Sequence, residues 1–381
     1  MSTFESKWIS DTEDFRALQH EWNELLRSST CNTLFMTWEW LFTWWQHLAE
    51  RRKLAILTIR QDGRLMAIAP MTIKPPDLRR MVPFSVMEIM GTGNVGSDYL
   101  SLIVRNGAET SFMPAITAAL FKRNYAMEIS ATERSSRVMA MAMLGLNDLG
   151  CRTGQQAQCL CPYIDLREQT WESYMKKTHQ SGKSRFDKKL RRLEKEYSLR
   201  FEQTQLESER GQNLATLIEL HLQRWNGKGG SNAFDSQALR DFHQTFSAIA
   251  LHNNWLRLFI MWLDDKPAAA VYGFFYNHVF YYYQAGFDPQ FSQYSVGYLA
   301  IGLTVQNALI EDAIEYDLLR GEEEYKNAWA TSARELLRLN IFPPTAKGRL
   351  CQRYLTLRKR TKELIVEHAP DSIRERVFAQ A

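Results

Sequence analysis

The sequence predicts an α/β (α+β) fold in which two similar halves each hold a mixed, twisted sheet flanked by helices. A strand hairpin at 54–73 and a second one at 256–276 are each followed by a strand-like run, a helical run and another strand-like run. The chain has 381 residues and is 45% hydrophobic, which suffices for two globular domains. An internal duplication is the simplest account of the repeated order, and chance repetition of α/β units is the alternative.

The first half opens with an amphipathic helix at 13–26, followed by a tryptophan-rich run at 38–45 that we expect in the core. The hairpin pairs 54–59 with 65–73 around a turn at Gln61, Asp62 and Gly63. The remaining elements are then expected in chain order, as a strand at 99–104, a helix at 112–123 and a strand at 126–131.

The second half repeats this order. Its hairpin pairs 256–263 with 268–276, and a strand at 279–285, a helix at 296–310 and a strand at 316–319 follow. An amphipathic helix at 212–225 precedes the hairpin and ends at a glycine-rich run, 227–230. We place the boundary between the halves near residues 160–164, which gives domains at 1–160 and 161–342.

Two segments are basic. Residues 176–195 form a helix whose apolar side chains share one face, so the charges are either simply solvated or meet an anionic or nucleotide-linked substrate, with Lys183, Arg185 and Arg191 as candidates. Residues 343–381 include a basic amphipathic helix that we expect to pack on the first domain, with Leu350, Tyr354, Leu357 and Leu364 inward. Membrane association of this helix is an alternative that we do not expect.

Charge and composition narrow the function classes. A net charge of +4 gives no reason to expect DNA binding. No apolar run approaches the ~20 residues of a membrane span, and the first ten residues do not resemble a signal peptide, so we expect a cytoplasmic protein. The five cysteines contain no CxxC pair, which favours reduced thiols over a disulfide framework or a zinc site, and we expect no metal.

Two nucleotide-binding motifs are matched only in part. Residues 91–96 fit GxGxxG, but a strand rather than a helix is expected after them, so we predict a loop. Gly182, Lys183 and Ser184 resemble the end of a phosphate-binding loop, but its first glycine would have to stand at Lys177.

The most specific stretch runs from 279 to 299. A strand leads into a turn at Asp288 and Pro289, and a helix then opens at Ser295 and Gly297. Free backbone N–H groups and the helix dipole make such a helix start suited to a pyrophosphate. Ser295 as an ordinary N-cap and Gly297 as a close-packing residue are the alternatives.

Six short pieces in this order carry a family resemblance. They are 35–45 (FMTWEWLFTWW), 97–100 (SDYL), 221–228 (HLQRWNGK), 285–289 (AGFDP), 295–299 (SVGYL) and 317–329 (DLLRGEEEYKNAW). They resemble the GNAT acyltransferases, and within them the CelD-type acetyltransferases of bacterial exopolysaccharide and cellulose loci. They are also similar to the related FemABX peptidyltransferases, which are tandem GNAT proteins. Val296 departs from the pattern, because a proline is common at that position.

The resemblance implies acyl-CoA, here acetyl-CoA, as co-substrate. It assigns the pantetheine and thioester to Tyr283, Gln284, Ala285 and Gly286, and the pyrophosphate to Ser295, Val296, Gly297, Tyr298 and Leu299. The first domain has no matching loop, because residues 106–109 would bring a carboxylate to the phosphate. The resemblance thus implies a degenerate GNAT-like domain at 1–160 that acts as scaffold and as one wall of the acceptor cleft, and an acyltransferase domain at 161–342.

Direct attack of an amine or hydroxyl on a thioester needs a base, an oxyanion stabiliser and an acid for the leaving thiolate. Asp317 or a glutamate of 322–324, with Glu323 at the centre, is a candidate base, and structural capping or plain solvation is the alternative for each. Tyr325 would protonate the thiolate and Lys326 would stabilise negative charge; the resemblance favours these two. His179 and His221 are weaker candidates.

Three functions remain open on the sequence. The first is an acyl-CoA-dependent N- or O-acetyltransferase that acts on a sugar or polysaccharide precursor, the acceptor class resting on resemblance alone. The second is FemABX-like transfer of an amino acid from aminoacyl-tRNA to a cell-wall precursor, in which the basic helix at 176–195 would bind the RNA. The third is a non-catalytic scaffold of polysaccharide assembly.

Overall fold

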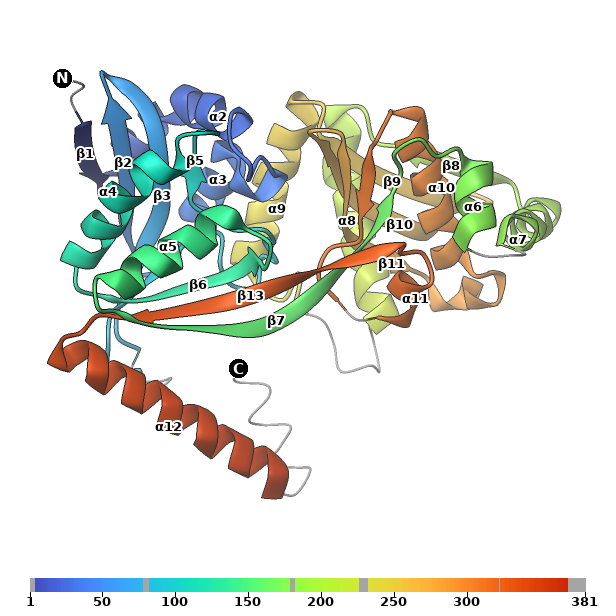
Figure 1. The fold of residues 1–381 in the computed structure, drawn as a ribbon. Helices are drawn as coiled ribbons and strands as arrows, with labels where there is room; N and C mark the ends of the chain where they lie inside the picture. Colours follow the sequence, from blue (N-terminus) through green and yellow to red (C-terminus); the bar gives the residue numbers. More distant parts are fainter. Residues whose placement is uncertain (1–3, 78–81, 179–181, 226–231, 322, 369–381) are drawn as a thin grey trace.

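The computed structural model describes residues 4–77, 82–178, 182–225, 232–321 and 323–368, with the backbone alone at 178, 182, 183, 359 and 362–368. Thirteen strands of this part of the chain form one continuous sheet in the order β1-β2-β3-β4-β6-β13-β7-β12-β11-β10-β9-β8, and β5 pairs with β3 off this path. The mixed α/β fold predicted from the sequence is therefore confirmed (Figure 1).

The first half supplies one side of the sheet. Its strands are β1 (Phe4–Ile9), β2 (Lys53–Gln61), β3 (Arg64–Lys74), β4 (Val86–Ile89), β5 (Ile103–Val104), β6 (Ala126–Glu133) and β7 (Arg152–Asp165). Its helices are α1 (Thr12–Ala17), α2 (Gln19–Arg27), the 3-10 turn η1 (Leu34–Met36), α3 (Trp38–Leu48), α4 (Glu109–Lys122) and α5 (Arg137–Asp148).

The second half supplies the other side. Its strands are β8 (Leu199–Gln203), β9 (Leu256–Leu263), β10 (Lys266–Tyr276), β11 (Val279–Phe287), β12 (Glu315–Asp317) and β13 (Ser332–Phe342). Its helices are α6 (Trp171–Thr178), α7 (Gly182–Glu196), α8 (Glu207–Trp225), α9 (Gln237–His252), the 3-10 turn η2 (Pro289–Tyr294), α10 (Val296–Ile310), α11 (Glu324–Asn327) and α12 (Ala346–His368).

The strand order has an internal symmetry. Each half runs through three antiparallel pairs and then one parallel pair, β4 with β6 in the first half and β11 with β12 in the second. The last strand of each half then crosses to the other, because β7 pairs with β12 and β13 pairs with β6. β7 and β13 also pair with each other from Ser332↔Tyr163 to Phe342↔Arg152, so the halves share one sheet.

This exchange bears on two sequence predictions. The boundary expected near 160–164 lies inside β7, the strand that joins the halves. The strand expected at 99–104 is wrong apart from Ile103–Val104; the counterpart of β11 is β4, which precedes that segment. The other predicted elements of the repeated order are present, and the helix expected at 13–26 is divided into α1 and α2 at Leu18.

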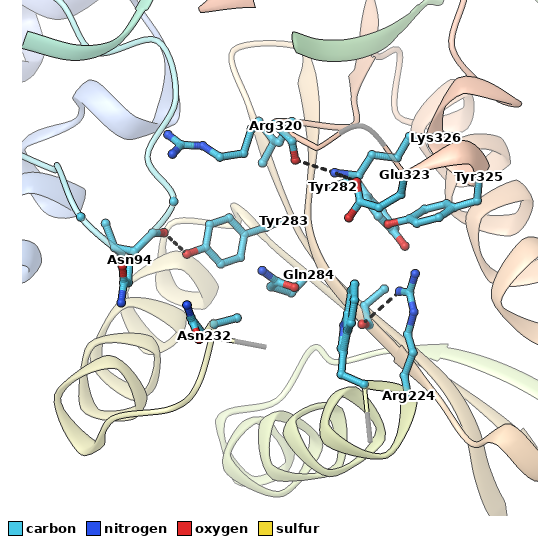
Figure 2. A pocket seen from close by; sticks show the side chains of 17 residues that line it. Asn94, Arg224, Asn232, Tyr282, Tyr283, Gln284, Arg320, Glu323, Tyr325 and Lys326 are labelled. Carbon is cyan, nitrogen blue, oxygen red and sulfur yellow. Dashed lines mark hydrogen bonds and ion pairs between the residues drawn. The ribbon is translucent and has the colours of Figure 1, made fainter. Parts of the chain in front are cut away.

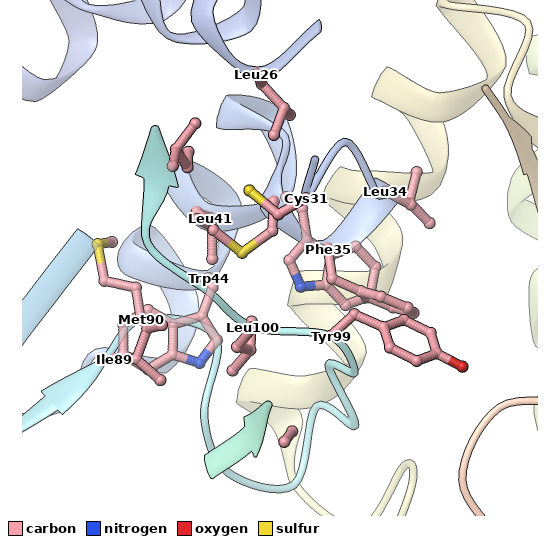
Figure 3. Close-up of a cluster of buried hydrophobic side chains, with 14 of the residues drawn as sticks. Leu26, Cys31, Leu34, Phe35, Leu41, Trp44, Ile89, Met90, Tyr99 and Leu100 are labelled. Atoms are coloured by element: carbon pink, nitrogen blue, oxygen red, sulfur yellow. The ribbon is translucent and has the colours of Figure 1, made fainter. Parts of the chain in front are cut away.

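Side chains of α3 join the two halves in the core. Trp40 is fully buried and makes edge-to-face contacts with Phe242 and Phe246 of α9, at ring distances of 5.0 and 4.7 Å. Trp44 lies beside Ile89, Met90 and Leu100 (Figure 3). The tryptophan-rich run is thus core, as its composition predicted, and it fixes the first half against α9.

The helix α12 contacts the first half through its first turns. Tyr354 packs edge-to-face on Phe84, and Cys351 is buried. The prediction that Leu350 and Leu357 face inward is wrong, because they are 59% and 66% exposed, while Leu364 lies outside the side chains described. The buried face belongs to Gly348, Cys351 and Tyr354 instead. No helix in the described part of the chain is long and apolar enough to cross a membrane.

Candidate active site

A cavity of about 340 Å³ lies where the two halves meet. Four segments line it, namely the loop 93–96 of the first half, the end of α8 with the residues after it, the middle of β11, and the segment 319–326. β11 pairs with β12 only over Val279–Tyr281, so its residues 282–287 are paired with β10 alone and their other edge is open. This open edge borders the cavity at Tyr282, Tyr283, Gln284 and Ala285 (Figure 2).

The loop at 91–96 is held in place from both halves. Trp44 Nε1 donates to the carbonyl of Thr92 at 3.0 Å, and Trp40 Nε1 donates to Ser97 Oγ at 2.8 Å. From the second half, the Tyr283 hydroxyl donates to the carbonyl of Val95. The GxGxxG stretch is therefore a loop, as predicted, but it also forms a wall of the cavity, which the sequence did not reveal.

Three carboxamides converge on the cavity from separate segments. They are Asn94 of the loop, Asn232 after α8 and Gln284 of β11, and Figure 2 shows Gln284 central among the labelled side chains. Within the described part of the chain, none of the three has a hydrogen-bond partner. Each amide therefore has a donor and an acceptor available to a ligand.

The segment 319–326 brings two predicted catalytic residues together. Lys326 is 6% exposed, and its ammonium donates to the carbonyl of Arg320 at 2.6 Å and pairs with Glu323 at 3.2 Å. Gly321, which follows Arg320, has φ +134°, and a Cβ there would come within 2.1 Å of Glu323 Oε2. Glycine is thus required for this turn, and Glu323, Tyr325 and Lys326 all line the cavity.

Arg320 ties this segment to the first half. Its guanidinium Nε donates to Asp98 Oδ1 at 2.5 Å, and its backbone N–H donates to Asp98 Oδ2 at 3.0 Å. Asp98 is completely buried, so this ion pair holds the carbonyl that accepts from Lys326 at a fixed place relative to the loop 93–96. The SDYL piece of the sequence therefore contributes Asp98 to the support of the site.

Asp317, the other predicted base, lies away from the cavity. It is 1% exposed, and its Oδ1 accepts from the backbone N–H of Leu319 at 2.8 Å. Burial, reinforced by the nearby charge of Glu315, raises the pKa of Asp317 to about 7. The structure does not bring Asp317 together with Glu323, Tyr325 and Lys326 at the cavity.

The predicted pyrophosphate loop lies at the start of α10. Ser295 adopts a left-handed conformation, φ 59°, and makes no side-chain cap; its hydroxyl instead accepts from Lys189 Nζ at 2.8 Å. Val296 and Leu299 are buried, whereas Tyr298 is half-buried and packs on Trp329. Lys189 comes from the basic helix α7, so that helix brings a cation to the first turn of α10.

Three glycines allow close contacts between the helices and the strand of this region. A Cβ on Gly302 of α10 would stand 2.2 Å from the ring of Phe186, so the ring of this α7 residue packs directly on the backbone of α10. A Cβ on Gly286 would stand 2.3 Å from the backbone nitrogen of His221, so α8 lies directly on β11 there. Gly297 faces the ring of Phe287, and its Cβ would stand 3.2 Å from that ring. The predicted donor residues 283–286 and 295–299 are thus joined through Phe287.

The remaining predicted residues lie outside the cavity lining. Arg185 and Arg191 are exposed on α7, and the side chain of Lys183 lies outside what is described, as do Glu322 and His179. His221 is buried, with its Nδ1 3.0 Å from the carbonyl of Ala285, and burial lowers its pKa. In the described residues, no group of three or more His, Cys, Asp and Glu side chains could hold a metal ion.

Several lining residues were not singled out from the sequence. Arg224 and Trp225 fall within the HLQRWNGK piece, which signalled family likeness without a role, and Arg320 falls within the DLLRGEEEYKNAW piece. Asn94 and Asn232 lie in segments without a periodic pattern, so only the tertiary structure shows that they meet Gln284.

Comparisons with known proteins identify the fold and one domain. Residues 180–327 match the family model described as an acetyltransferase (GNAT) domain. The crystal structure of FemX superposes with a TM-score of 0.61 at 12% identity, covering 87% of this chain and 96% of that one. The C-terminal domain (DUF2156) of a putative lysylphosphatidylglycerol synthetase from Agrobacterium fabrum gives a TM-score of 0.52 at 9% identity, covering 91% and 97%.

A further solved structure, L-PGS from Bacillus licheniformis, gives a TM-score of 0.50 at 13% identity and covers 91% of this chain and 99% of that one. No curated protein matched the chain. At these identities the structural likenesses show the fold, and they extend over both halves. The predicted transferase class is confirmed by the domain match: over residues 180–327 the chain carries an acetyltransferase (GNAT) domain, within a fold that it shares with FemX.

Proposed function

We propose that this protein is an acyl-CoA-dependent N- or O-acetyltransferase that acts on a sugar or polysaccharide precursor of the CelD type. The observation that carries the proposal is the cavity itself, in which the open edge of β11, free carboxamides and the Glu323–Lys326 pair meet at one place. GNAT domains typically take their acyl group from acyl-CoA. A donor on β11 and an acceptor in the cavity would then lie side by side.

The donor side of the proposal rests on β11 and α10. Residues 282–287 pair with no described strand on the edge that faces the cavity, and such an edge can bind the amides of a pantetheine arm. The first-turn N–H groups of α10 have no intrahelical acceptor, and Lys189 adds a positive charge beside them. Both features favour a pyrophosphate at the start of α10.

The acceptor side rests on the chemistry of the cavity wall. A sugar presents several hydroxyl groups around a ring, and Asn94, Asn232 and Gln284 each offer it a donor and an acceptor. Aromatic side chains line the same cavity at Trp225, Tyr282, Tyr283 and Tyr325, and they offer apolar faces for the ring. Burial raises the pKa values of Tyr282 and Tyr283, so both stay protonated.

The proposed chemistry uses the three predicted residues that line the cavity. The acceptor nitrogen or oxygen attacks the thioester carbon while Glu323 takes its proton. Lys326 stabilises the oxyanion that forms, and Tyr325 protonates the thiolate when the carbon–sulfur bond breaks. Glu323 is preferred over Asp317 because only Glu323 reaches the cavity.

An acetyl-transfer assay tests the proposal. Free thiol released from acetyl-CoA would be measured with a panel of hexoses and hexosamines, for the native chain and for Glu323→Gln and Lys326→Met. We expect acceptor-dependent thiol release, with kcat reduced about 10²- to 10³-fold in each variant. Arg137→Gln, at an exposed position of α5, serves as the control and should retain native kcat.

The outcome that contradicts the proposal is equally specific. If acetyl-CoA neither binds nor loses its acetyl group, while aminoacyl-tRNA transfers its amino acid to a cell-wall precursor, the donor is wrong. The fold shared with FemX makes aminoacyl-tRNA the alternative donor to include in the assay.

A further inference from the structure

The last turn of α8 presents an arginine to the cavity in an unusual setting. The Arg224 guanidinium is half-buried and lies over three aromatic rings, at 4.9 Å from Tyr325, 5.4 Å from Phe287 and 5.5 Å from Trp225. Rings attract a guanidinium through its charge and flat face and leave its N–H groups available. The three rings therefore help to hold the side chain in place without occupying its N–H donors.

The charges of the cavity wall do not balance at this arginine. Among the residues that the structure describes, three cations line the cavity, and two of them are neutralised, Arg320 by Asp98 and Lys326 by Glu323. Among the described residues no carboxylate forms an ion pair with Arg224, which donates to the carbonyl of Ala285 at 3.5 Å and hydrogen-bonds with the side chain of Tyr325. A partly buried charge without a counterion is costly. The described part of the wall thus carries one positive charge without a carboxylate partner, that of Arg224, which lies among the lining side chains in Figure 2.

We propose that the acceptor carries an oxyanion group, a carboxylate or a phosphate, that Arg224 binds. The planar guanidinium matches both groups through paired N–H donors. The inference rests on the proposed function, because it assigns a substrate class, an acidic sugar derivative, to the same cavity. The three carboxamides would hydrogen-bond with the hydroxyl groups of the sugar ring, and Arg224 would bind its carboxylate or phosphate. Arg224 is a specificity-determining residue in this account.

Anion binding tests this without an acyl-transfer assay. Melting temperatures of the full chain would be recorded with sodium phosphate and with sodium acetate, against sodium chloride at equal ionic strength. The variants are Arg224→Gln, which removes the charge, and Arg224→Lys, which keeps the charge and removes the planar fork. Arg137→Gln, at an exposed arginine of α5, is the matched control.

We expect at least one of the two anions to raise the melting temperature of the native chain and of Arg137→Gln. In Arg224→Gln the apparent Kd should rise at least about tenfold, with a smaller rise in Arg224→Lys. The anion with the larger Arg224-dependent effect distinguishes phosphate from carboxylate. If neither anion acts on the native chain, or if Arg224→Gln retains the native affinity for both, the inference is wrong.

A parallel titration with acetyl-CoA separates this inference from the proposed function. If Arg224→Gln binds acetyl-CoA as the native chain does and loses the anion effect, Arg224 serves the acceptor, as proposed. If Arg224→Gln weakens acetyl-CoA binding as much as anion binding, Arg224 serves the donor and the inference is overturned. An Arg224-dependent anion effect in a chain that binds no acetyl-CoA would support the anion site and contradict the donor.

Discussion

At the scale of single residues, the site depends on positions where only glycine fits. Gly321 lies against the paired side chains of Glu323 and Lys326, and its φ of +134° is a conformation that side chains rarely adopt. The sequence marked the glutamates and the lysine around this glycine as chemical candidates. It did not mark the glycine, because a turn requirement becomes visible only when the two flanking side chains are seen to fold back toward each other.

Gly321→Ala should therefore damage catalysis more than stability. The new Cβ would stand 2.1 Å from Glu323 Oε2 and 2.5 Å from Lys326 Nζ, so both side chains must leave their places. We expect kcat to fall by more than about tenfold, because a small misplacement of reacting groups is costly. The control is Gly63→Ala, which also has positive φ, +80°, but has no atom within 4 Å of its Cβ. Equal kcat in both variants would contradict this role of Gly321.

Asp317 predicts a pH dependence of stability. Its pKa is raised to about 7 in the folded chain by burial, against about 4 when unfolded. Between these values the folded chain holds one more proton than the unfolded chain. Stability therefore falls as pH rises from about 4 to about 7, by at most about 1.4 kcal/mol per pH unit, and levels off above pH 7.

Denaturant melts from pH 5 to pH 8 check this prediction. Asp317→Asn cannot ionise, so it should gain stability relative to the native chain as the pH rises through this window. Asp241→Asn, at an exposed position of α9, should keep a constant difference from the native chain. A constant difference for Asp317→Asn as well would show that Asp317 is ionised throughout.

At the scale of elements, α8 and α10 take their places from close contacts with β11. α8 lies so near β11 that the backbone nitrogen of His221 would be 2.3 Å from a Cβ on Gly286. α8 in turn carries Arg224 and Trp225 to the cavity. The position of the acceptor wall therefore depends on the contact at Gly286.

Gly286→Ala should destabilise the fold, because the obstacle is backbone and not a flexible side chain. We expect a loss of about 1–3 kcal/mol or more in the free energy of unfolding, measured by denaturant titration. Gly154→Ala, on β7 with nothing within 4 Å of its Cβ, is the control and should change stability little. Native stability in Gly286→Ala would mean that α8 can shift away from β11 without cost.

Much of this element structure follows from sequence patterns. The two hairpins are predicted by β-rich runs on either side of a turn signal, and α10 by the serine and glycine at its start. The sequence does not predict the short strand β4, since four residues show too little alternation, and it places the counterpart of β11 at 99–104 instead. The sequence assigns Arg224 no role, because its contacts with Phe287 and Tyr325 involve residues far away in the sequence.

At the scale of the whole molecule, the exchanged strands make the halves one folding unit. β13 lies between β6 and β7, and β7 closes the second half against β12. Either half alone would lack the strand that the other supplies and would expose unpaired strand edges. The cavity also needs both halves, because the loop 93–96 forms its wall opposite β11.

Cooperative unfolding follows from this arrangement. Residues 1–165 produced alone should lack a sharp thermal transition, whereas the full chain should show one transition by both near-UV and far-UV circular dichroism. The near-UV signal reports the packing of Trp40 between the halves. A cooperative melt of the isolated first half would show that it folds without β13.

The most direct test of the account is whether acetyl-CoA binds at β11 and the start of α10. Melting temperatures would be compared with and without acetyl-CoA, with ATP as the control ligand, for the native chain, Gly297→Glu and Gly154→Glu. Gly297→Glu adds a carboxylate at the first turn of α10, and Gly154→Glu adds the same group at an open position of β7. At ~100 times its Kd the ligand should add about 2.7 kcal/mol of stability.

We predict a rise of several degrees with acetyl-CoA for the native chain and for Gly154→Glu, no rise with ATP, and no rise with acetyl-CoA for Gly297→Glu. An unchanged melting temperature of the native chain in saturating acetyl-CoA would contradict the acyl-CoA donor.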